Sequence, residues 1–205
     1  MKLKSANTRN VSLYGRLHAD NPEYGNSSPA LVGAITYILK NSDIDLNPAD
    51  RILDFGCGKS DAVVKVAKNL RITFEKYDPA IEKYAKAPVG DYRVVINTDV
   101  LEHIDEEELP ALLTDISSLS EHALFNISTR PAKTILANGE NAHATVKRAE
   151  WWQKEIQKFF EHSCIVWKSD DQVLIATFEV SPKVMKNVAL LRRGGIVAKL
   201  AKLML

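Results

Sequence analysis

The sequence of 205 residues predicts a doubly wound α/β fold with a mostly parallel sheet. Two observations carry this prediction. Short apolar segments typical of strands alternate with segments whose apolar residues have helical spacing, which is the pattern of a parallel sheet with helices on both faces. The last two strand segments are joined by the tight turn Ser169-Asp170-Asp171, which favours an antiparallel hairpin at one edge of the sheet.

The expected elements follow in order along the chain. Residues 1–28 look irregular, and Ser28 suits the N-cap of a helix over 29–41 with Pro29 in its first turn. The remaining strands are predicted at 51–55, 72–78, 92–98, 122–128, 162–168 and 172–180, and the remaining helices at 60–70, 105–119 and 149–160. The acids at 105–108 are expected to form the first turn of their helix, where they suit the macrodipole.

Composition narrows the classes of function. The hydrophobic content of 45% and the charged content of 26% are those of an ordinary globular protein. The net charge of +1 argues against nucleic acid as the main partner, because that partner requires a basic excess. The two cysteines, Cys57 and Cys164, form no disulfide framework and suit a reducing compartment. We therefore expect a cytoplasmic location, without a signal peptide or an apolar membrane span.

The segment 51–70, RILDFGCGKSDAVVKVAKNL, places two glycines between a strand and a helix, and three ligands compete for this turn. Its GKS triplet resembles the end of a P-loop, but Leu53 stands where a P-loop needs a further glycine. A dinucleotide-binding turn needs its third glycine where Asp61 stands, and an acid there would repel the pyrophosphate. Both phosphate ligands are therefore disfavoured.

S-adenosylmethionine fits the same turn, because it carries no phosphate and its sulfur is positively charged. It needs an acid at the strand end, small residues under its methionine part and a second acid for the ribose hydroxyls. Asp54, Gly56 and Gly58 meet the first two needs. Asp78, at the end of the next strand, lies where a ribose-binding acid belongs in a βαβ unit. The alternative is that the two glycines only make a tight turn.

The motifs DFGCG (54–58), YDP (77–79) and DVLEHI (99–104) resemble the successive motifs of class I S-adenosylmethionine-dependent methyltransferases. The segment Asn141-Ala142-His143, followed by Trp151-Trp152, is similar to small methyltransferases of phage genomes and bacterial surface-polysaccharide clusters. The resemblance covers roughly 24–180. It implies a Rossmann-like fold and S-adenosylmethionine as the cofactor, with Cys57, Pro79, Asp99 and Tyr24 added to its binding residues.

The resemblance also divides the chain into three parts. Residues 1–28, with Tyr14, Tyr24 and Gly25, would cap the cofactor, although a surface-packed tail is the alternative. Residues 29–180 form the methyltransferase domain. Within it, the segment 79–91 is too short for the helix, strand and helix of a usual core. The third strand is therefore expected to be reduced or lost, together with the loop that often holds the adenine.

Several polar residues are candidates for the acceptor end of the site. Asp99 would face the methionine end of the cofactor. His103 is a candidate general base for a hydroxyl, since its pKa lies near the working pH, or else it fixes its loop by hydrogen bonds; Glu102 is open in the same way. The long loop 129–148 opens on the ligand side, and its His143 is the best candidate for acceptor contact or proton removal, with loop anchoring as the alternative.

Other residues carry weaker expectations. Arg130 and Asn141 are further polar candidates of the same loop. One of Trp151 and Trp152 could stack on a sugar or apolar face, although packing of both is the alternative. The histidines His18, His122 and His162 show no metal-ligand spacing, and no metal site is expected.

The C-terminal segment 181–205 carries basic residues and no acid. Its helical spacing predicts a basic amphipathic helix that lies on an anionic membrane surface or docks on a second subunit, unless it packs on its own domain.

The expected function is S-adenosylmethionine-dependent methyl transfer to a small-molecule or glycan acceptor, with O-methylation favoured. The segment that begins at Asn97 lacks the Pro-Pro-aromatic run of base methylases, and nucleic acid is not expected as a partner. A non-catalytic cofactor-binding module remains an alternative, as does a nicotinamide-dependent oxidoreductase, against which Asp61 argues.

Overall fold

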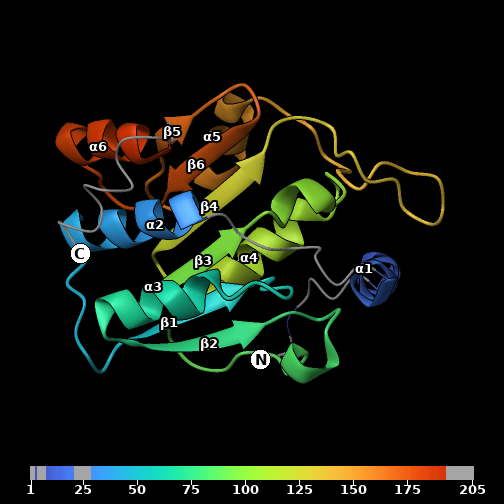
Figure 1. The fold of residues 1–205 in the computed structure, drawn as a ribbon, viewed down its shortest axis with the longest axis horizontal. Coiled ribbons are helices and arrows are strands. Elements are labelled where there is room, and N and C mark those ends of the chain that lie inside the picture. The colour runs from blue at the N-terminus through green and yellow to red at the C-terminus, as the bar shows by residue number, and fades with distance from the viewer. Residues whose placement is uncertain (1–2, 4–7, 21–28, 193–205) are drawn as a thin grey trace.

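The computed structural model describes residues 3, 8–20 and 29–192, which form one six-stranded sheet between two layers of helices (Figure 1). The strands are β1 (Arg51–Phe55), β2 (Thr73–Tyr77), β3 (Val94–Thr98), β4 (Ala123–Ser128), β5 (Cys164–Lys168) and β6 (Gln172–Ala176). Their order in the sheet is β2-β1-β3-β4-β6-β5. The first four strands pair in parallel, and β6 and β5 join as antiparallel strands at one edge. This arrangement confirms the predicted fold class.

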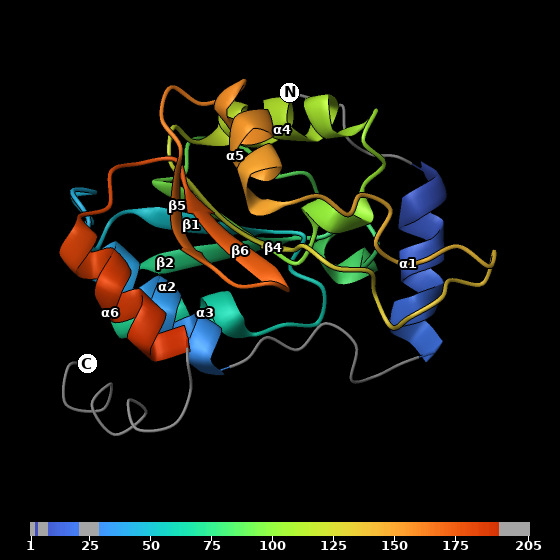
Figure 2. The same ribbon diagram turned by 90° about the horizontal axis from the view of Figure 1, so that it is seen from above.

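Helices cover both faces of the sheet. They are α1 (Thr8–Asp20), α2 (Pro29–Asn41), α3 (Ala62–Leu70), α4 (Leu109–Leu119), α5 (Ala149–Gln157) and α6 (Pro182–Arg192), with short 3-10 turns η1 (Glu82–Tyr84) and η2 (Leu101–His103). Helices α2, α3 and α6 lie on one face, and α4 and α5 lie on the other (Figure 2). Each helix predicted from residue 29 to residue 160 is present, with shifts of a few residues at the ends.

The start of α4 differs from the prediction. The acids at 105–108 precede the helix instead of forming its first turn, and the helix begins at Leu109 with Pro110 in its first turn. Proline has no backbone N–H and its ring excludes it from a helix interior, so the helix cannot extend several residues further back.

Two apolar clusters fill the space between the sheet and its helices. Side chains alternate between the faces of a strand. In β1, Ile52 therefore packs with α2 and α3, whereas Leu53 and Phe55 pack with α4 and α5. Asp54 shares the face of Ile52, which directs its carboxyl group to the α3 side of the sheet.

The third strand of a usual core is absent from the described part of the chain, as predicted. Residues 79–91 contain only the 3-10 turn η1, and β2 is left as an edge strand. Phe74 of β2 is consequently 42% exposed.

The prediction of an irregular N-terminus is wrong for residues 8–20, which form helix α1. This helix stands beyond the carboxyl ends of the parallel strands, beside the loop 129–148 (Figures 1 and 2). Val11, Tyr14 and Leu17 recur every third residue along it. This spacing is typical of a helix, but it covers only three residues, and most residues between them are polar. Ser28, Tyr24 and Gly25 lie outside the described residues.

Helix α6 packs on its own domain. Val184 and Val188 are buried against α2 and β5, and Asn187 Nδ2 donates to Tyr37 Oη at 2.6 Å. At the end of the helix, the Arg192 guanidinium lies 4.3 Å from the centre of the Trp167 ring. For residues 182–192, packing on the chain's own domain, one of the alternatives left open by the sequence, is therefore the arrangement observed. Residues 193–205 lie outside the described part.

Among the described residues, no helix has the length and apolar character needed to span a membrane.

Candidate active site

A cavity of about 450 Å³ opens beyond the carboxyl ends of the parallel strands. Its wall is formed by the strand ends, by the loop 129–148 and by Val11 and Tyr14 of α1. Ligands of doubly wound sheets bind at this end. The residues that line the cavity include Gly56, Cys57, Gly58, Asp78, Pro79, Asp99, Glu102, His103, Ser128, Arg130, Lys133 and His143.

The glycine turn lies at the end of β1 and requires glycine for two reasons. Gly56 has φ +80 and Gly58 has φ +50, a region that disfavours side chains. A Cβ on Gly56 would also come within 2.4 Å of Val100 Cγ2. The amides of Gly56 and Cys57 both donate to the carbonyl oxygen of Tyr77, at 2.8 and 3.1 Å. The turn is thereby held against the end of β2, and its backbone forms one wall of the cavity.

Cys57 contributes an apolar wall rather than a reactive thiol. Its side chain is buried, and its Sγ donates to the carbonyl oxygen of Gly58 at 3.4 Å. Burial, reinforced by the nearby charge of Asp54, raises the pKa of the thiol. A thiol that stays protonated is a weak nucleophile.

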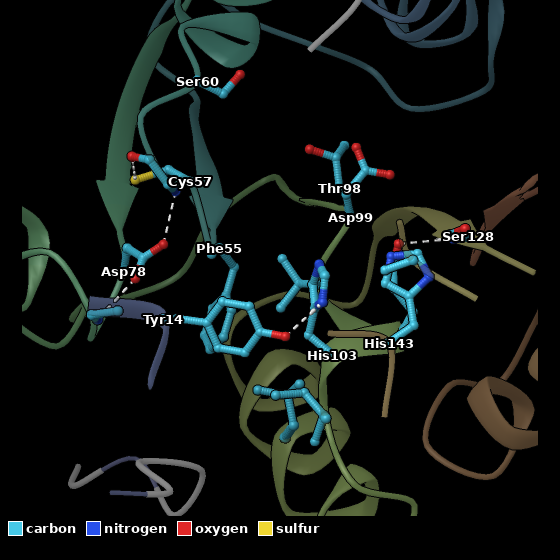
Figure 3. A pocket seen from close by; sticks show the side chains of 18 of the residues that line it. Tyr14, Phe55, Cys57, Ser60, Asp78, Thr98, Asp99, His103, Ser128 and His143 are labelled. Carbon is cyan, nitrogen blue, oxygen red and sulfur yellow. Dashed lines mark hydrogen bonds between the residues drawn. The ribbon is translucent and has the colours of Figure 1, made fainter. Parts of the chain in front are cut away.

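Asp78 lies at the end of β2, beside the glycine turn, and faces the cavity (Figure 3). One carboxylate oxygen accepts the amide of Gly58 at 2.8 Å, and the other accepts the amide of Ala80 at 2.9 Å. A carboxylate oxygen has two lone-pair directions, so each can accept one more hydrogen bond. The side chain is thus oriented by backbone and still able to receive two hydroxyl groups.

Asp54 differs from the expectation, because it does not line the cavity. Its carboxyl group is 2% exposed and lies beneath the glycine turn, where Oδ2 has no hydrogen-bond partner among the described residues. Burial raises its pKa to about 7, the positive charge of Lys76 lowers it, and Asp78 raises it. Asp54 is therefore not placed to contact a ligand in the cavity directly. Any effect of Asp54 on a ligand would be transmitted through the glycine turn.

Asp99 follows β3 and lines the cavity, and Figure 3 shows it above His103 and His143. Its backbone has φ +56, which is uncommon for a residue other than glycine and is better tolerated by aspartate than by most. The side chain of Asn126 donates to its Oδ1 at 2.8 Å. Burial raises the pKa of Asp99 to about 6. The hydrogen bond from Asn126 and the positive charge of Arg192 act in the opposite direction and lower it. The carboxyl group is nevertheless open to the solvent of the cavity, where a cationic ligand would lower its pKa.

His103 and His143 meet at the other end of the cavity, with ring centroids 5.0 Å apart (Figure 3). His103 Nδ1 lies 2.8 Å from the carbonyl oxygen of Ala142 and 2.8 Å from the hydroxyl of Tyr14. His143 Nδ1 lies 2.6 Å from the carbonyl oxygen of Arg130. A carbonyl oxygen only accepts, so we assign the hydrogen to Nδ1 in both rings. Each neutral ring then carries its lone pair on Nε2. Burial lowers the pKa of His143, which favours that neutral form.

Glu102 is the functional candidate that sequence reasoning left undecided. It is 1% exposed, and its Oε1 accepts the amide of Ser128 at 2.9 Å. Burial, and then the negative charge of Asp99, raise its pKa well above the usual value. One carboxylate oxygen of Glu102 and one ring nitrogen each of His103 and His143 lie within 4.8 Å of one another. Spacing along the chain did not indicate this cluster, because its members come from two distant segments.

The loop 129–148 is held in shape by its own polar residues. The Asn141 side chain accepts the amides of Ala132 and His143, each at 2.9 Å, and donates to the carbonyl oxygen of Ala132. Thr145 ties the loop to η2 through the carbonyl oxygens of Glu102 and Ile104. Asn141 is therefore a loop anchor, and it delivers His143 to the cavity.

The two tryptophans lie away from the cavity. Trp152 is fully buried in the core, and Trp151 packs against it edge to face with centroids 5.1 Å apart. Neither lines the cavity. The structure therefore supports packing of both tryptophans, and not stacking of one of them on a ligand in the cavity.

The sheet order and the cavity at the carboxyl ends of the parallel strands define a Rossmann-like α/β fold. A family model described as a methyltransferase domain matches residues 29–170, and the chain belongs to this family. A comparison of the sequence with curated proteins finds no significant match.

Solved structures of similar fold include several methyltransferases. An O-methyltransferase family protein from Burkholderia thailandensis has a TM-score of 0.54 at 12% identity, covering 87% of this chain and 62% of that chain. The N-terminal domain of EvdMO1, solved with S-adenosylhomocysteine bound, has a TM-score of 0.51 at 12% identity, covering 75% and 82%. Mitomycin 7-O-methyltransferase MmcR has a TM-score of 0.51 at 11% identity, covering 72% of this chain and 53% of that chain. At these identities the likeness concerns the fold, and the matched region spans about half of MmcR.

Proposed function

We propose that this methyltransferase binds S-adenosylmethionine at the glycine turn and transfers its methyl group to an oxygen of a small-molecule or glycan acceptor. The observation that carries this proposal is one continuous cavity with two different ends. Asp78 and the glycine turn form one end, and the pair His103–His143 forms the other, with Asp99 near the histidines (Figure 3). A nucleoside-binding end and a proton-accepting end are the two parts that such a transfer requires.

The cofactor would lie along the turn from Asp78 to Asp99. The free lone pairs of Asp78 would accept the two ribose hydroxyls, and the flat backbone of the glycine turn would lie under the methionine part. The Asp99 carboxylate would attract the positive charge of the ammonium and sulfonium groups. Pro79 and Ala80, which line the cavity beyond Asp78, would contact the adenine in place of the missing third strand.

The transfer itself would be an in-line displacement at the methyl carbon. A bond forms between the acceptor oxygen and the methyl carbon while the bond from carbon to sulfur breaks, and S-adenosylhomocysteine leaves with the electron pair. The acceptor proton would pass to His103 or His143, which line that end of the cavity. The main contribution of the protein is to place the two reactants in line.

An oxygen acceptor is favoured by the character of that end of the cavity. Arg130 and Lys133 line the cavity and add cationic groups there, and Arg130 Nε also pairs with Asp171 Oδ2 at 3.5 Å. A hydroxylated molecule, including a sugar of a surface polysaccharide, would suit such a polar opening.

The test is a calorimetric titration of the purified chain with S-adenosylhomocysteine, with NADH as the control ligand. We expect binding of the first ligand alone. Binding of NADH alone would instead favour an oxidoreductase, and binding of neither would leave the glycine turn as a structural feature. Screening of hydroxylated acceptors for methyl transfer follows from a positive result. Tight binding of S-adenosylhomocysteine without transfer to any acceptor would favour a non-catalytic module, which the reduced sheet also motivates.

A further inference from the structure

We propose that Glu102, His103 and His143 form a binding site for a divalent transition-metal cation at the acceptor end of the cavity. The site would hold the cation directly on these three side chains. One oxygen or ring nitrogen from each lies within 4.8 Å of the others, and all three residues line the cavity. The metal site stands on this geometry alone, whereas its link to the acceptor rests on the proposed function.

The two histidines are oriented as metal ligands usually are. A ligating imidazole donates its second N–H to a carbonyl or carboxylate, which sets the tautomer and the direction of the ring. His103 Nδ1 faces the carbonyl oxygen of Ala142 at 2.8 Å, and His143 Nδ1 faces that of Arg130 at 2.6 Å. Two backbone carbonyls thus fix the orientation of two neighbouring rings, and one nitrogen of each ring belongs to the cluster. A role as loop anchors would require only the Nδ1 contacts and would not require the rings to converge.

Glu102 supplies an independent observation. Its side chain is 1% exposed, and the amide of Ser128 holds Oε1 at 2.9 Å. Its Oε2 is buried and has no hydrogen-bond partner among the described residues. A buried carboxyl group is protonated, paired with an opposite charge or bound to a metal. The described residues show no ion pair to Glu102, and a cation between it and the two histidines would complete its environment.

Closing the cluster on an ion requires only small movements. Ligand atoms bonded at about 2.1 Å to a tetrahedral metal lie about 3.4 Å apart. The present separations are at most 4.8 Å, so they exceed this value by no more than about 1.4 Å. His143 is half-buried at the cavity wall, so its side chain has room to move, while Asn141 keeps its backbone in place.

The donor set indicates the class of metal. Two imidazoles with one carboxylate suit zinc, iron or cobalt, whereas magnesium and calcium prefer oxygen ligands alone. Three protein ligands leave at least one coordination position open, as in catalytic sites. Because all three residues line the cavity, an oxygen of the acceptor would take that position. With the cation bound, the two histidines act as ligands, and the acceptor proton, made more acidic by the cation, passes to solvent instead of to them. A hydroxyl group, or two adjacent hydroxyl groups that chelate the ion, is therefore the favoured acceptor chemistry.

The test measures metal binding without acceptor or turnover. The full chain, first freed of metal with a chelator, is titrated with Zn²⁺ by calorimetry and with Co²⁺ by its visible absorption. We expect one equivalent of each ion to bind. We expect His143→Gln and Glu102→Gln to weaken binding at least about tenfold, since even outer-shell changes cost that much. His162→Gln, at the opposite end of the sheet, is the matched control and should bind as the wild type does.

Binding of S-adenosylhomocysteine is measured on the same samples. If the wild-type protein binds S-adenosylhomocysteine but neither Zn²⁺ nor Co²⁺, the metal site is overturned and the proposed function still stands. Metal binding that survives both substitutions, or that His162→Gln weakens equally, would also overturn the site. If Glu102→Gln fails to fold, as judged by circular dichroism, the half-buried His143→Gln still decides the outcome.

Discussion

The Asp78 carboxylate accepts the amide of Gly58 at 2.8 Å, so the end of β2 and the glycine turn after β1 form one unit. The bond joins two neighbouring parallel strands at the point where both enter the cavity. A side chain fixed in this way is preorganised, and a ligand that binds it does not have to order it first.

Replacing Asp78 tests the ribose assignment. Asp78→Ala should weaken binding of S-adenosylhomocysteine by roughly 1.5–3 kcal/mol, the range for hydrogen bonds to charged groups. Calorimetric titration measures the change. Asp61→Ala is the control, because Asp61 ends the loop that contains Gly58 but is exposed and pairs with Lys65. Unchanged affinity in Asp78→Ala would remove the assignment.

The two ends of the cavity should respond separately to substitution. His143→Ala should lower methyl transfer to an acceptor found by screening, because the residue lies at the acceptor end. Its affinity for S-adenosylhomocysteine should stay within about twofold of wild type, because Asp78 and the glycine turn are unchanged. Calorimetry on the variant checks this second expectation. A large loss of affinity would instead place His143 at the cofactor or in the folding of the loop.

The glycine turn should not tolerate a side chain at its first position. Gly56→Ala places a methyl group 2.4 Å from Val100 Cγ2 and keeps φ at +80. We expect a loss of roughly 1–3 kcal/mol in the free energy of unfolding, measured in urea. Gly33→Ala in α2 is the control. Its added Cβ meets nothing within 4 Å, so it should be neutral or stabilising by up to about 1 kcal/mol. Equal effects of the two changes would contradict the close approach.

The buried Asp54 should make stability depend on pH. Its pKa is about 7 in the folded protein and near 3.8 when unfolded, so the folded form binds the proton more tightly between these values. The contribution of Asp54 to the free energy of unfolding therefore falls as the pH rises from about 4 to 7. Asp54→Asn removes the ionisable group and with it this pH-dependent loss of stability. Relative to wild type, the variant should gain on the order of 2–3 kcal/mol between pH 5 and pH 8.

Urea unfolding at several pH values measures that gain. Asp61→Asn is the matched control, because Lys65 lowers the pKa of the exposed Asp61 instead of raising it. A gain of the same sign and size in Asp61→Asn, or none in Asp54→Asn, would show that Asp54 is not the responsible group.

Helix α6 should contribute to the stability of the domain. Val188 is 0% exposed, and Val188→Ala should cost roughly 1–3 kcal/mol of the free energy of unfolding. Leu190 on the same helix is 45% exposed, and Leu190→Ala should change that free energy by less than about 0.5 kcal/mol. Urea unfolding of both variants checks the difference. Similar values would mean that α6 does not pack as described.

Local patterns in the sequence were enough to predict most of the sheet. The apolar runs around β1, β3 and β4 and the tight turn before β6 are signals that a few neighbouring residues carry. The position of Asp78 beside the glycine turn follows from parallel pairing of β1 with β2, which a βαβ unit imposes. The loss of the third strand followed from the length of the segment 79–91 alone.

Long-range packing decided the remainder. Helix α1 has too few apolar residues to be evident by itself, and it is positioned by contacts such as that of Tyr14 with His103. Asp54 is at the predicted strand end, but the alternation of β1 turns its carboxyl group beneath the glycine turn instead of into the cavity. Glu102, His103 and His143 converge only because the loop 129–148 folds back over η2. A strand or turn depends on neighbours in the chain, whereas such a cluster depends on how distant segments pack.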